Sequence, residues 1–328
     1  MAIIRCSKCG HVAEITSDSV GATLSCPRCQ NPTMPYDTVF FVRKVLEKYF
    51  ALQASLKRVE AEADNQEAPE TVRQPSLEGI NLYSTDQISS EQQYRPINEW
   101  FQAGKIQVRP DHKAVDTMGF FDEVAVEIGK NYGLLKAVLD QIRYAQTKGF
   151  TSIHVNLSKR SQKEAEGIAA FCRQLYDYSF VARYFYQKPE KIVRLTLQSS
   201  PRIQSFFAGE WMEWLAMMQV LELCQERRID LSLARRLSVV FPNEDLHELD
   251  LFFVLNGSTP VCIECKTGEF RQSIDKYVTL RRRLGLEKEQ FVVAVVGLSE
   301  EQGRGLSSMY DLTFVGESGL GPHLGRVV

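Results

Sequence analysis

The sequence predicts an α/β protein in which a C-terminal domain built on a mixed sheet follows an α+β domain and a small cysteine-rich module. Three observations lead to this prediction. Four cysteines form two close pairs within the first 29 residues, helix and strand patterns alternate between residues 120 and 197, and the last 125 residues read as α-β-β-β-α-β. The chain has 328 residues, 44% of them hydrophobic, which is enough for more than one core.

The composition excludes a membrane-spanning protein. The longest apolar runs, such as residues 251–255 and 291–296, are far shorter than the roughly 20 residues of a membrane helix. The first residues lack the apolar region of a secretory signal. The sequence therefore predicts a cytoplasmic protein without a membrane partner.

The formal net charge of −2 hides an uneven distribution along the chain. Counting Lys and Arg against Asp and Glu gives −7 for residues 60–99, +5 for residues 159–203 and −5 for residues 204–328. The whole-chain value therefore says little about any one surface, and it leaves a nucleic-acid partner open.

The N-terminal cysteines have the spacing of a zinc ribbon, which we expect over residues 1–36. Two C-x2-C pairs separated by sixteen residues let two tight turns present four thiolates to one Zn²⁺ ion; the ligands are Cys6, Cys9, Cys26 and Cys29. So short a segment cannot bury enough surface to fold alone, so the zinc would be structural. Two disulfides are the competing interpretation, which a reducing compartment disfavours, and His11 is expected to be a bystander.

The other four cysteines do not predict a metal site. Cys262 and Cys265 also form C-x2-C, but they lie on a predicted strand, where residues three apart point to opposite faces. Cys172 and Cys224 occupy apolar positions of predicted helices, as small hydrophobic residues do.

Two segments separate the ribbon from the rest of the chain. Residues 37–60 predict an amphipathic helix, which either packs on a neighbouring domain or pairs two subunits of a homodimer in a short coiled coil. Residues 61–99 are acidic and poor in apolar residues, and predict a flexible linker.

Residues 100–203 predict a winged-helix-like domain. A helical pattern from Phe120 to Gly149 precedes a strand at 152–155, a helix at about 161–178 and a hairpin of strands at 180–186 and 192–197, which would be the wing. The excess positive charge of this segment indicates a nucleic-acid surface, with solvated surface charge as the alternative. The candidate binding residues are Lys159, Arg160, Lys163, Arg183, Lys188, Lys191 and Arg194.

The chemistry is expected in residues 204–328. A helix over about 209–227 is followed by strands at 237–241, 248–255 and 260–266, a helix over about 271–284 and an apolar strand at 291–296. Asn256-Gly257 predicts the hairpin turn between the second and third strands.

Alternation along the third strand places Glu264 and Lys266 on one face, and Asp250 lies across the hairpin from them. Charged groups beside an apolar sheet need partners. Two carboxylates from neighbouring strands suit Mg²⁺ or Mn²⁺, and a lysine beside them can orient a water, help to deprotonate it or offset phosphate charge.

These residues resemble the PD-(D/E)XK nuclease superfamily, and more closely the nuclease domain of the CRISPR-associated accessory nucleases activated by cyclic oligoadenylates. The motifs that carry the resemblance are Gly209-Glu-Trp-Met-Glu213, Glu248-Leu-Asp250, Glu264-Cys-Lys-Thr-Gly268 and Leu280-Arg-Arg-Arg-Leu-Gly285. The resemblance implies a PD-(D/E)XK domain in which Asp250 and Glu264 bind the catalytic metal and Lys266 serves the attacking water. It also implies that Glu213 helps to bind metal or water and that Lys276 faces the phosphate.

The resemblance covers about residues 205–300 and departs from the family in two places. The proline of the superfamily name is replaced by Leu249, and a zinc ribbon and linker stand where the family has a Rossmann-like sensor, so control by cyclic oligoadenylate is not supported. The sequence therefore predicts a Mg²⁺- or Mn²⁺-dependent nuclease acting on DNA or RNA, and it leaves endonuclease and exonuclease activity both open. The alternative is a nucleic-acid-binding regulator that uses an inactive nuclease fold as a dimerisation or docking platform.

Overall fold

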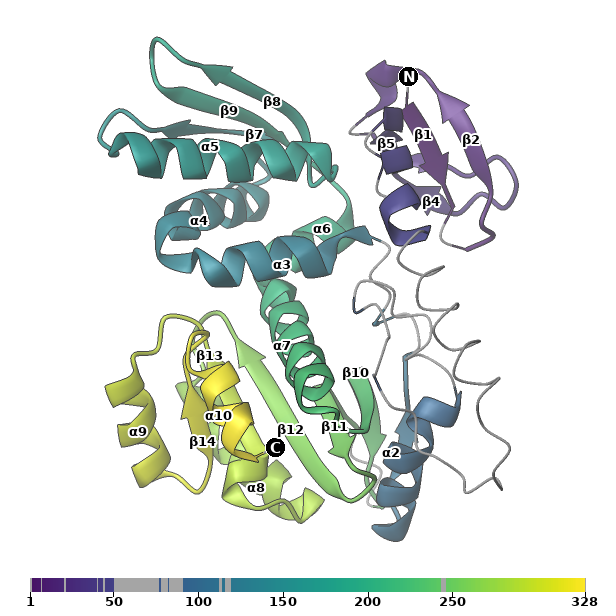
Figure 1. Ribbon diagram of the computed structural model, residues 1–328, viewed down its shortest axis with the longest axis vertical. Helices are drawn as coiled ribbons and strands as arrows, with labels where there is room; N and C mark the ends of the chain where they lie inside the picture. The colour runs from purple at the N-terminus through teal and green to yellow at the C-terminus, as the bar shows by residue number, and fades with distance from the viewer. Residues whose placement is uncertain are drawn as a thin grey trace. The chain divides into compact units, whose positions relative to one another are not determined.

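Figure 1 shows a computed structural model of the chain. It describes residues 2–6, 8–20, 22–39, 41–43, 45–49, 77, 82, 91–111, 114–115, 119–242 and 246–327. The chain divides into two compact units, one made of Met1–Phe50 and Lys130–Ala208, the other of Ala51–Gly129 and Gly209–Val328. Within the described residues, every helix is too short or too polar to cross a lipid bilayer.

The N-terminal segment is a small β structure. Strands β1 (Ala2–Arg5), β2 (Val12–Ile15) and β5 (Pro35–Asp37) form an antiparallel sheet with β1 in the centre, and β3 (Leu24–Ser25) pairs with β4 (Pro32–Thr33). A 3₁₀ turn, η1 (Ser17–Ser19), precedes β3. The hydroxyl of Thr33 donates to the carbonyl of Arg5 at 2.9 Å and so joins the two sheets.

Residues 38–39, 41–43 and 45–49 are helical, in agreement with the start of the predicted helix. The rest of that helix, at 40, 44 and 50–60, lies outside the described residues, as do linker residues 61–76, 78–81 and 83–90.

Residues 130–208 form an α+β layer with the predicted element order. Helices α4 (Tyr132–Lys148) and α5 (Gln162–Asp177) pack on one side of an antiparallel sheet of β7 (Ser152–Asn156), β9 (Ile192–Leu197) and β8 (Val181–Gln187), with β9 in the centre (Figure 1). The short helix α6 (Pro201–Ser205) follows β9. Helix α5 begins at a capping box, because the Ser161 hydroxyl accepts from the backbone N–H of Glu164 and the Glu164 carboxylate accepts from that of Ser161.

The single helical pattern predicted from Phe120 to Gly149 is two helices. Helix α3 (Phe121–Lys130) ends before Asn131, and α4 begins at Tyr132. The predicted end at Gly149 is confirmed, because Gly149 has φ +73° and its N–H closes the last turn of α4.

The second unit is built on a six-stranded mixed sheet in the order β14-β13-β12-β11-β10-β6. Antiparallel pairing joins β6 (Gln107–Arg109), β10 (Leu231–Val240), β11 (Leu246–Leu255) and β12 (Thr259–Lys266). Parallel pairing joins β12 to β13 (Phe291–Val295) and β13 to β14 (Thr313–Val315). The predicted hairpin turn is confirmed, since Asn256 and Gly257 have φ of 47° and 68°.

Helices cover both faces of this sheet. One face packs against α2 (Glu91–Ala103) and α8 (Ile274–Leu284) through a core that includes Phe252, Cys262 and Val293. The alternate residues Phe253 and Ile263 are also completely buried, and α7 (Trp211–Arg227) packs against β10–β12, with α10 (Leu320–Val327) packed on α7. Helix α9 (Glu300–Met309) packs against β14. A π-helical turn (Phe206–Glu210) precedes α7, and 3₁₀ turns precede α8 (Arg271–Ser273) and β13 (Lys288–Gln290).

Two predicted boundaries are wrong. Residues 91–99 are helical rather than linker, because Tyr94, Ile97 and Phe101 form a stripe at helical spacing that is buried in the core of the second unit. Residues 100–129 do not belong with the α+β layer, because β6 pairs with β10 at the edge of the large sheet.

Candidate functional site

The charged residues predicted for catalysis gather where β11 and β12 pass each other. The register that pairs Leu251 with Ile263 brings Asp250 next to the end of β12, where its Oδ2 accepts the backbone N–H of Cys265 at 2.7 Å. The Lys266 Nζ lies 3.5 Å from Asp250 Oδ2 and 3.7 Å from Glu264 Oε2. The structure thus brings all three side chains into one cluster, as the alternation predicted.

Glu264 is the most deeply buried member, with a side chain only 6% exposed. Its Oε1 has no hydrogen-bond partner among the described residues. Burial, together with the neighbouring Asp250 carboxylate, raises the pKa of Glu264 to about 8, although Lys266 and Lys276 oppose the shift. A buried carboxylate oxygen without a donor is costly, so this atom marks a place where a cation would fit.

Lys266 is held in its charged form. Burial alone would lower its pKa, but the charges of Asp250 and Glu264 outweigh burial and raise the pKa above the usual lysine value. The Nζ also lies 5.7 Å from the centre of the Tyr277 ring, on α8. Tyr277 was not predicted, and it supplies a second, neutral contact that fixes the lysine beside the carboxylates.

Glu213 is positioned by an arginine that sequence reasoning missed. Arg235 NH1 lies 2.7 Å from Glu213 Oε2, with side chains 4% and 14% exposed. The Arg235 Nε donates to the Ala114 carbonyl at 2.6 Å, and its guanidinium lies 4.2 Å from the centre of the Trp214 ring. Burial and the charge of Asp250 raise the pKa of Glu213, and Arg235 opposes that rise. The sequence does carry a signal for this residue, because two adjacent arginines lie within an apolar run. The strand predicted there began at residue 237, two residues too late to include Arg235.

The start of α7 lies directly against the end of β12. A Cβ at Gly209 would come within 2.9 Å of the Thr267 hydroxyl, so the glycine permits a close approach. Both residues belong to the sequence motifs named above. Their contact explains how Glu213, one turn further along α7, reaches the cluster.

The remaining charges form an exposed rim. Arg236, which has φ +56° and interrupts the ladder of β10, lies 3.5 Å from Glu210 and 3.6 Å from Glu248. Lys276 is exposed on α8, near enough for its charge to lower the pKa of Glu264. It is therefore placed at the mouth of the cluster rather than inside it.

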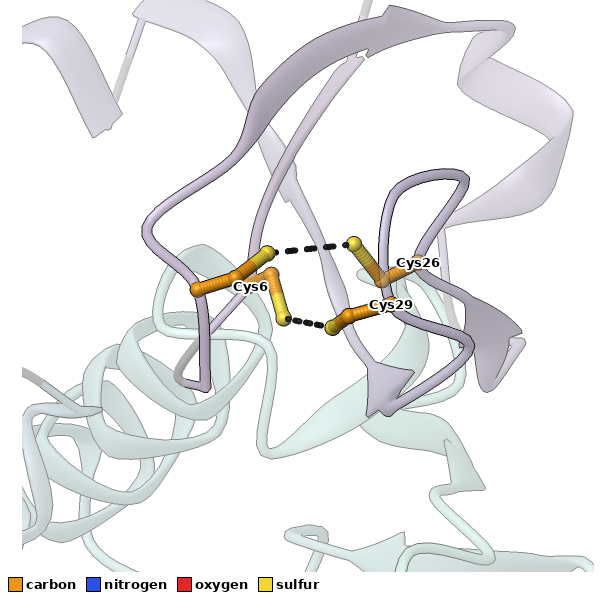
Figure 2. Close-up of side chains that lie close together, drawn as sticks. Cys6, Cys26 and Cys29 are labelled. Atoms are coloured by element: carbon orange, nitrogen blue, oxygen red, sulfur yellow. Dashed lines mark hydrogen bonds between the residues drawn. The ribbon is translucent and has the colours of Figure 1, made fainter.

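The four N-terminal cysteines form a second candidate site. Their Sγ atoms all lie within 4.8 Å of one another, and Figure 2 shows the sulfur atoms of Cys6, Cys26 and Cys29 turned toward one another. The distance from Cys6 to Cys29 is 3.4 Å and that from Cys9 to Cys26 is 3.7 Å. A disulfide would be about 2.05 Å, so the thiols are free, and they could hold a metal ion such as zinc.

Two matching turns create this cluster. In the first, the N–H of Cys6 donates to the carbonyl of His11 and the N–H of Gly10 to that of Cys6; in the second, Cys26 donates to Asn31 and Gln30 to Cys26. Gly10 and Gln30 have φ of 70° and 58° at equivalent positions. A hydrogen bond from the backbone of Asn31 lowers the pKa of Cys29, but burial and the Cys6 thiol outweigh it and raise that pKa to about 12. Burial raises the pKa of Cys6, but hydrogen bonds from the backbone of Cys9 and Lys8 outweigh it and lower that pKa to about 6. A thiolate is the form that binds metal.

The other four cysteines lie in the interior of the protein. Cys172, Cys224, Cys262 and Cys265 are buried and unpaired, and burial raises the pKa of each. Among the described residues, only the N-terminal group has the geometry for a metal cluster of three or more such side chains.

The predicted basic residues are all exposed, most of them on or beside the three-stranded sheet. Arg183 and Arg194 lie on the outer face of the three-stranded sheet, and Lys188 and Lys191 at its hairpin turn. The loop with Lys159 and Arg160 is tied to that turn, because the Leu157 N–H donates to the Lys191 carbonyl at 2.8 Å. Lys163 is apart from them, on the first turn of α5, where it lines a shallow pocket with Asn131 and Leu134.

The homodimer stays a prediction. Val39, Val42, Leu46 and Tyr49 follow a 3-4-3 spacing along the helical residues and are 78%, 45%, 47% and 55% exposed. That stripe has the a/d spacing of a coiled coil.

Comparison with known proteins gives structural neighbours at low identity. No protein-family model matches the chain, and no curated protein matches its sequence. The solved structures similar to it include protein VC1899 from Vibrio cholerae, with 16% identity and a TM-score of 0.47. They also include Can2 from Sulfobacillus thermosulfidooxidans in complex with cyclic tetra-adenylate, with 11% identity and a TM-score of 0.49. Each match covers 70% of this chain, and the chain spans 60% and 59% of the two structures.

Proposed function

We propose that the chain is a metal-dependent nuclease whose active site is the cluster of Asp250, Glu264 and Lys266. The observation that carries the proposal is the buried Glu264 carboxylate, one oxygen of which has no hydrogen-bond donor among the described residues, beside a second carboxylate and a charged lysine. Asp250 and Glu264 would hold a Mg²⁺ or Mn²⁺ ion, the hard cations that carboxylate oxygens suit. When bound, such an ion polarises a phosphodiester and lowers the pKa of a bound water.

The protein groups have separate tasks in this proposal. Lys266 is kept protonated by the two carboxylates, so it donates hydrogen bonds and stabilises negative charge on a phosphate rather than accepting a proton. The sequence left open whether Lys266 offsets phosphate charge or helps to deprotonate a water. The two carboxylates beside Nζ favour the first role, because they keep the lysine protonated. Glu213, fixed by Arg235, would complete the acidic wall, and the exposed Lys276 would meet the substrate backbone at the mouth. We further propose that the four cysteines bind a structural zinc ion and that the basic α+β layer holds the nucleic acid.

Cleavage by purified protein tests the proposal. Labelled single- and double-stranded DNA and RNA are incubated with Mg²⁺ or Mn²⁺, and the products are resolved on denaturing gels. Asp250→Asn and Lys266→Met should each lower the cleavage rate by at least about a hundredfold. Glu269→Gln is the matched control, because it also removes a carboxylate near β12, but one that is 56% exposed and paired with Arg271.

Two results would contradict the nuclease. Undiminished cleavage by both variants would show that this cluster is not the active site. Metal-independent binding of nucleic acid without cleavage by the parent chain would favour the regulator that uses this fold as a platform.

A further inference from the structure

We infer that the outer face of the β7–β9–β8 sheet binds single-stranded nucleic acid, with a base stacked on Phe185. The inference rests on the proposed function, and it specifies that the nucleic acid bound is single-stranded. The outer face consists of every second residue of the three strands, beginning at Ser152 in β7, Arg183 in β8 and Ile192 in β9. The residues between them, such as Val155 and Val193, are buried toward α4 and α5.

The cross-strand register places one row of side chains across the middle of this face. His154 pairs with Arg194, and Arg194 pairs with Phe185. Neighbouring strands are about 5 Å apart, so the guanidinium, the imidazole and the phenyl ring can contact one bound nucleotide together. Arg194 is held in this row, because its NH1 lies 3.3 Å from His154 Nε2 and its NH2 donates to Gln187 Oε1 at 3.3 Å.

Phe185 is 61% exposed on a face whose other outward residues are polar or cationic, except for Ile192, which is only partly exposed. An exposed aromatic ring beside arginines is the arrangement that proteins use to stack unpaired bases. The bases of a duplex are stacked on each other and cannot reach such a ring. The aromatic side chain thus favours a single strand over a double helix.

The charge of this face fits a phosphate chain. Each strand contributes three outward residues, and none of the nine is Asp or Glu, while Arg183 and Arg194 are exposed. The hairpin turn adds Lys188 and Lys191 against one carboxylate, Glu190, which accepts a hydrogen bond from the Gln187 side chain. A nucleic-acid backbone therefore meets no carboxylate along the strands.

Helix α5, which a winged-helix interpretation would place against the nucleic acid, is less suited to this task. It carries two basic residues against three acidic ones. Arg173 is paired with Asp177 at 3.0 Å, and Arg160, just before the helix, lies 3.8 Å from Glu164. Two of the cations on and next to α5 are thus offset by neighbouring carboxylates.

The test is binding of a fluorescein-labelled oligodeoxythymidylate of about 12 nucleotides, a length within the usual site sizes of single-strand binding domains. Anisotropy is measured with the full chain, with neither Mg²⁺, Mn²⁺ nor chelator added. Phe185→Ala should weaken binding about 5- to 100-fold, and Phe185→Trp should restore it. Arg194→Met should weaken binding and reduce the slope of log K against log salt by about 0.7. The matched control is Phe150→Ala, since Phe150 is 57% exposed in the same unit but lies outside the sheet.

Three results would overturn the inference: Phe185→Ala binding as the parent does, Phe150→Ala being equally impaired, or a duplex of the same length binding as tightly as the single strand. The experiments distinguish failure of this inference from failure of the nuclease proposal. Binding through Phe185 without cleavage would leave this inference standing and refute the nuclease, and Asp250-dependent cleavage with Phe185-independent binding would do the reverse.

Discussion

Replacing Arg235 with methionine should cost more stability than any other single loss of charge near the site. Methionine keeps most of the length and apolar volume of the side chain but leaves the buried Glu213 without its partner at 2.7 Å. Removing one member of a buried pair typically costs about 3–5 kcal/mol. The carbonyl of Ala114 also loses its donor, and the Trp214 ring loses a cation. We therefore expect Arg235→Met to lower the unfolding free energy by about 3–5 kcal/mol.

The assay is urea unfolding at pH 7, followed by circular dichroism and tryptophan fluorescence, with Arg236→Met as the control. Arg236 is the next residue, but it is 41% exposed and its ion pairs are 3.5 and 3.6 Å long, so its loss should cost less than about 1 kcal/mol. Adding Glu213→Gln to Arg235→Met should recover part of the loss, because the unpaired carboxylate is then gone. Equal effects of the two arginine variants, or a cost below about 1 kcal/mol for Arg235→Met, would refute this account of the site.

Two further predictions concern the carboxylate cluster and the cysteines. Because the pKa of Glu264 is raised from 4.5 to about 8, the folded state binds its proton more tightly than the unfolded chain, so this group costs stability progressively as pH rises from about 4.5 to about 8. Without added Mg²⁺ or Mn²⁺, the unfolding free energy of Glu264→Gln should therefore match that of the parent near pH 4 and exceed it by up to about 5 kcal/mol at pH 8 or above. A difference in unfolding free energy that does not change with pH would contradict this. Elemental analysis should find about one zinc per chain, lost in Cys6→Ser and retained in Cys172→Ser; equal zinc in the two variants would exclude the N-terminal site.

The parts of the fold that could be predicted are those that local physics determines. The Asn256-Gly257 turn fixes the register of β11 and β12, and that register alone brings Asp250 next to Glu264 and Lys266. The two C-x2-C turns likewise need no information from distant residues. Each of these predictions depends on residues within about one hairpin of each other.

The parts that could not be predicted depend on long-range pairing. Helix α2 has Tyr94 and Ile97 on one face, but its acidic surroundings resemble a linker until the large sheet supplies a surface to bury them. Strand β6 has three residues and is defined only by its pairing with β10. Arg235 pairs with Glu213, which is 22 residues away on another element, and no spacing in the sequence predicts that contact.

The charges of the cluster determine what it can bind. Asp250, Glu264 and Glu213 form ion pairs with Lys266 and Arg235, and in their ionised forms these five groups carry a net charge of −1. Arg235 is committed to Glu213 at 2.7 Å, whereas Lys266 is shared between two carboxylates at 3.5 and 3.7 Å and satisfies neither at ideal distance. A divalent cation at Asp250 and Glu264 would turn the net charge to +1, which matches a phosphodiester anion, and would leave Lys266 able to turn toward that anion. A monovalent cation would only neutralise the cluster, so the charge balance favours a divalent ion with a phosphate ligand.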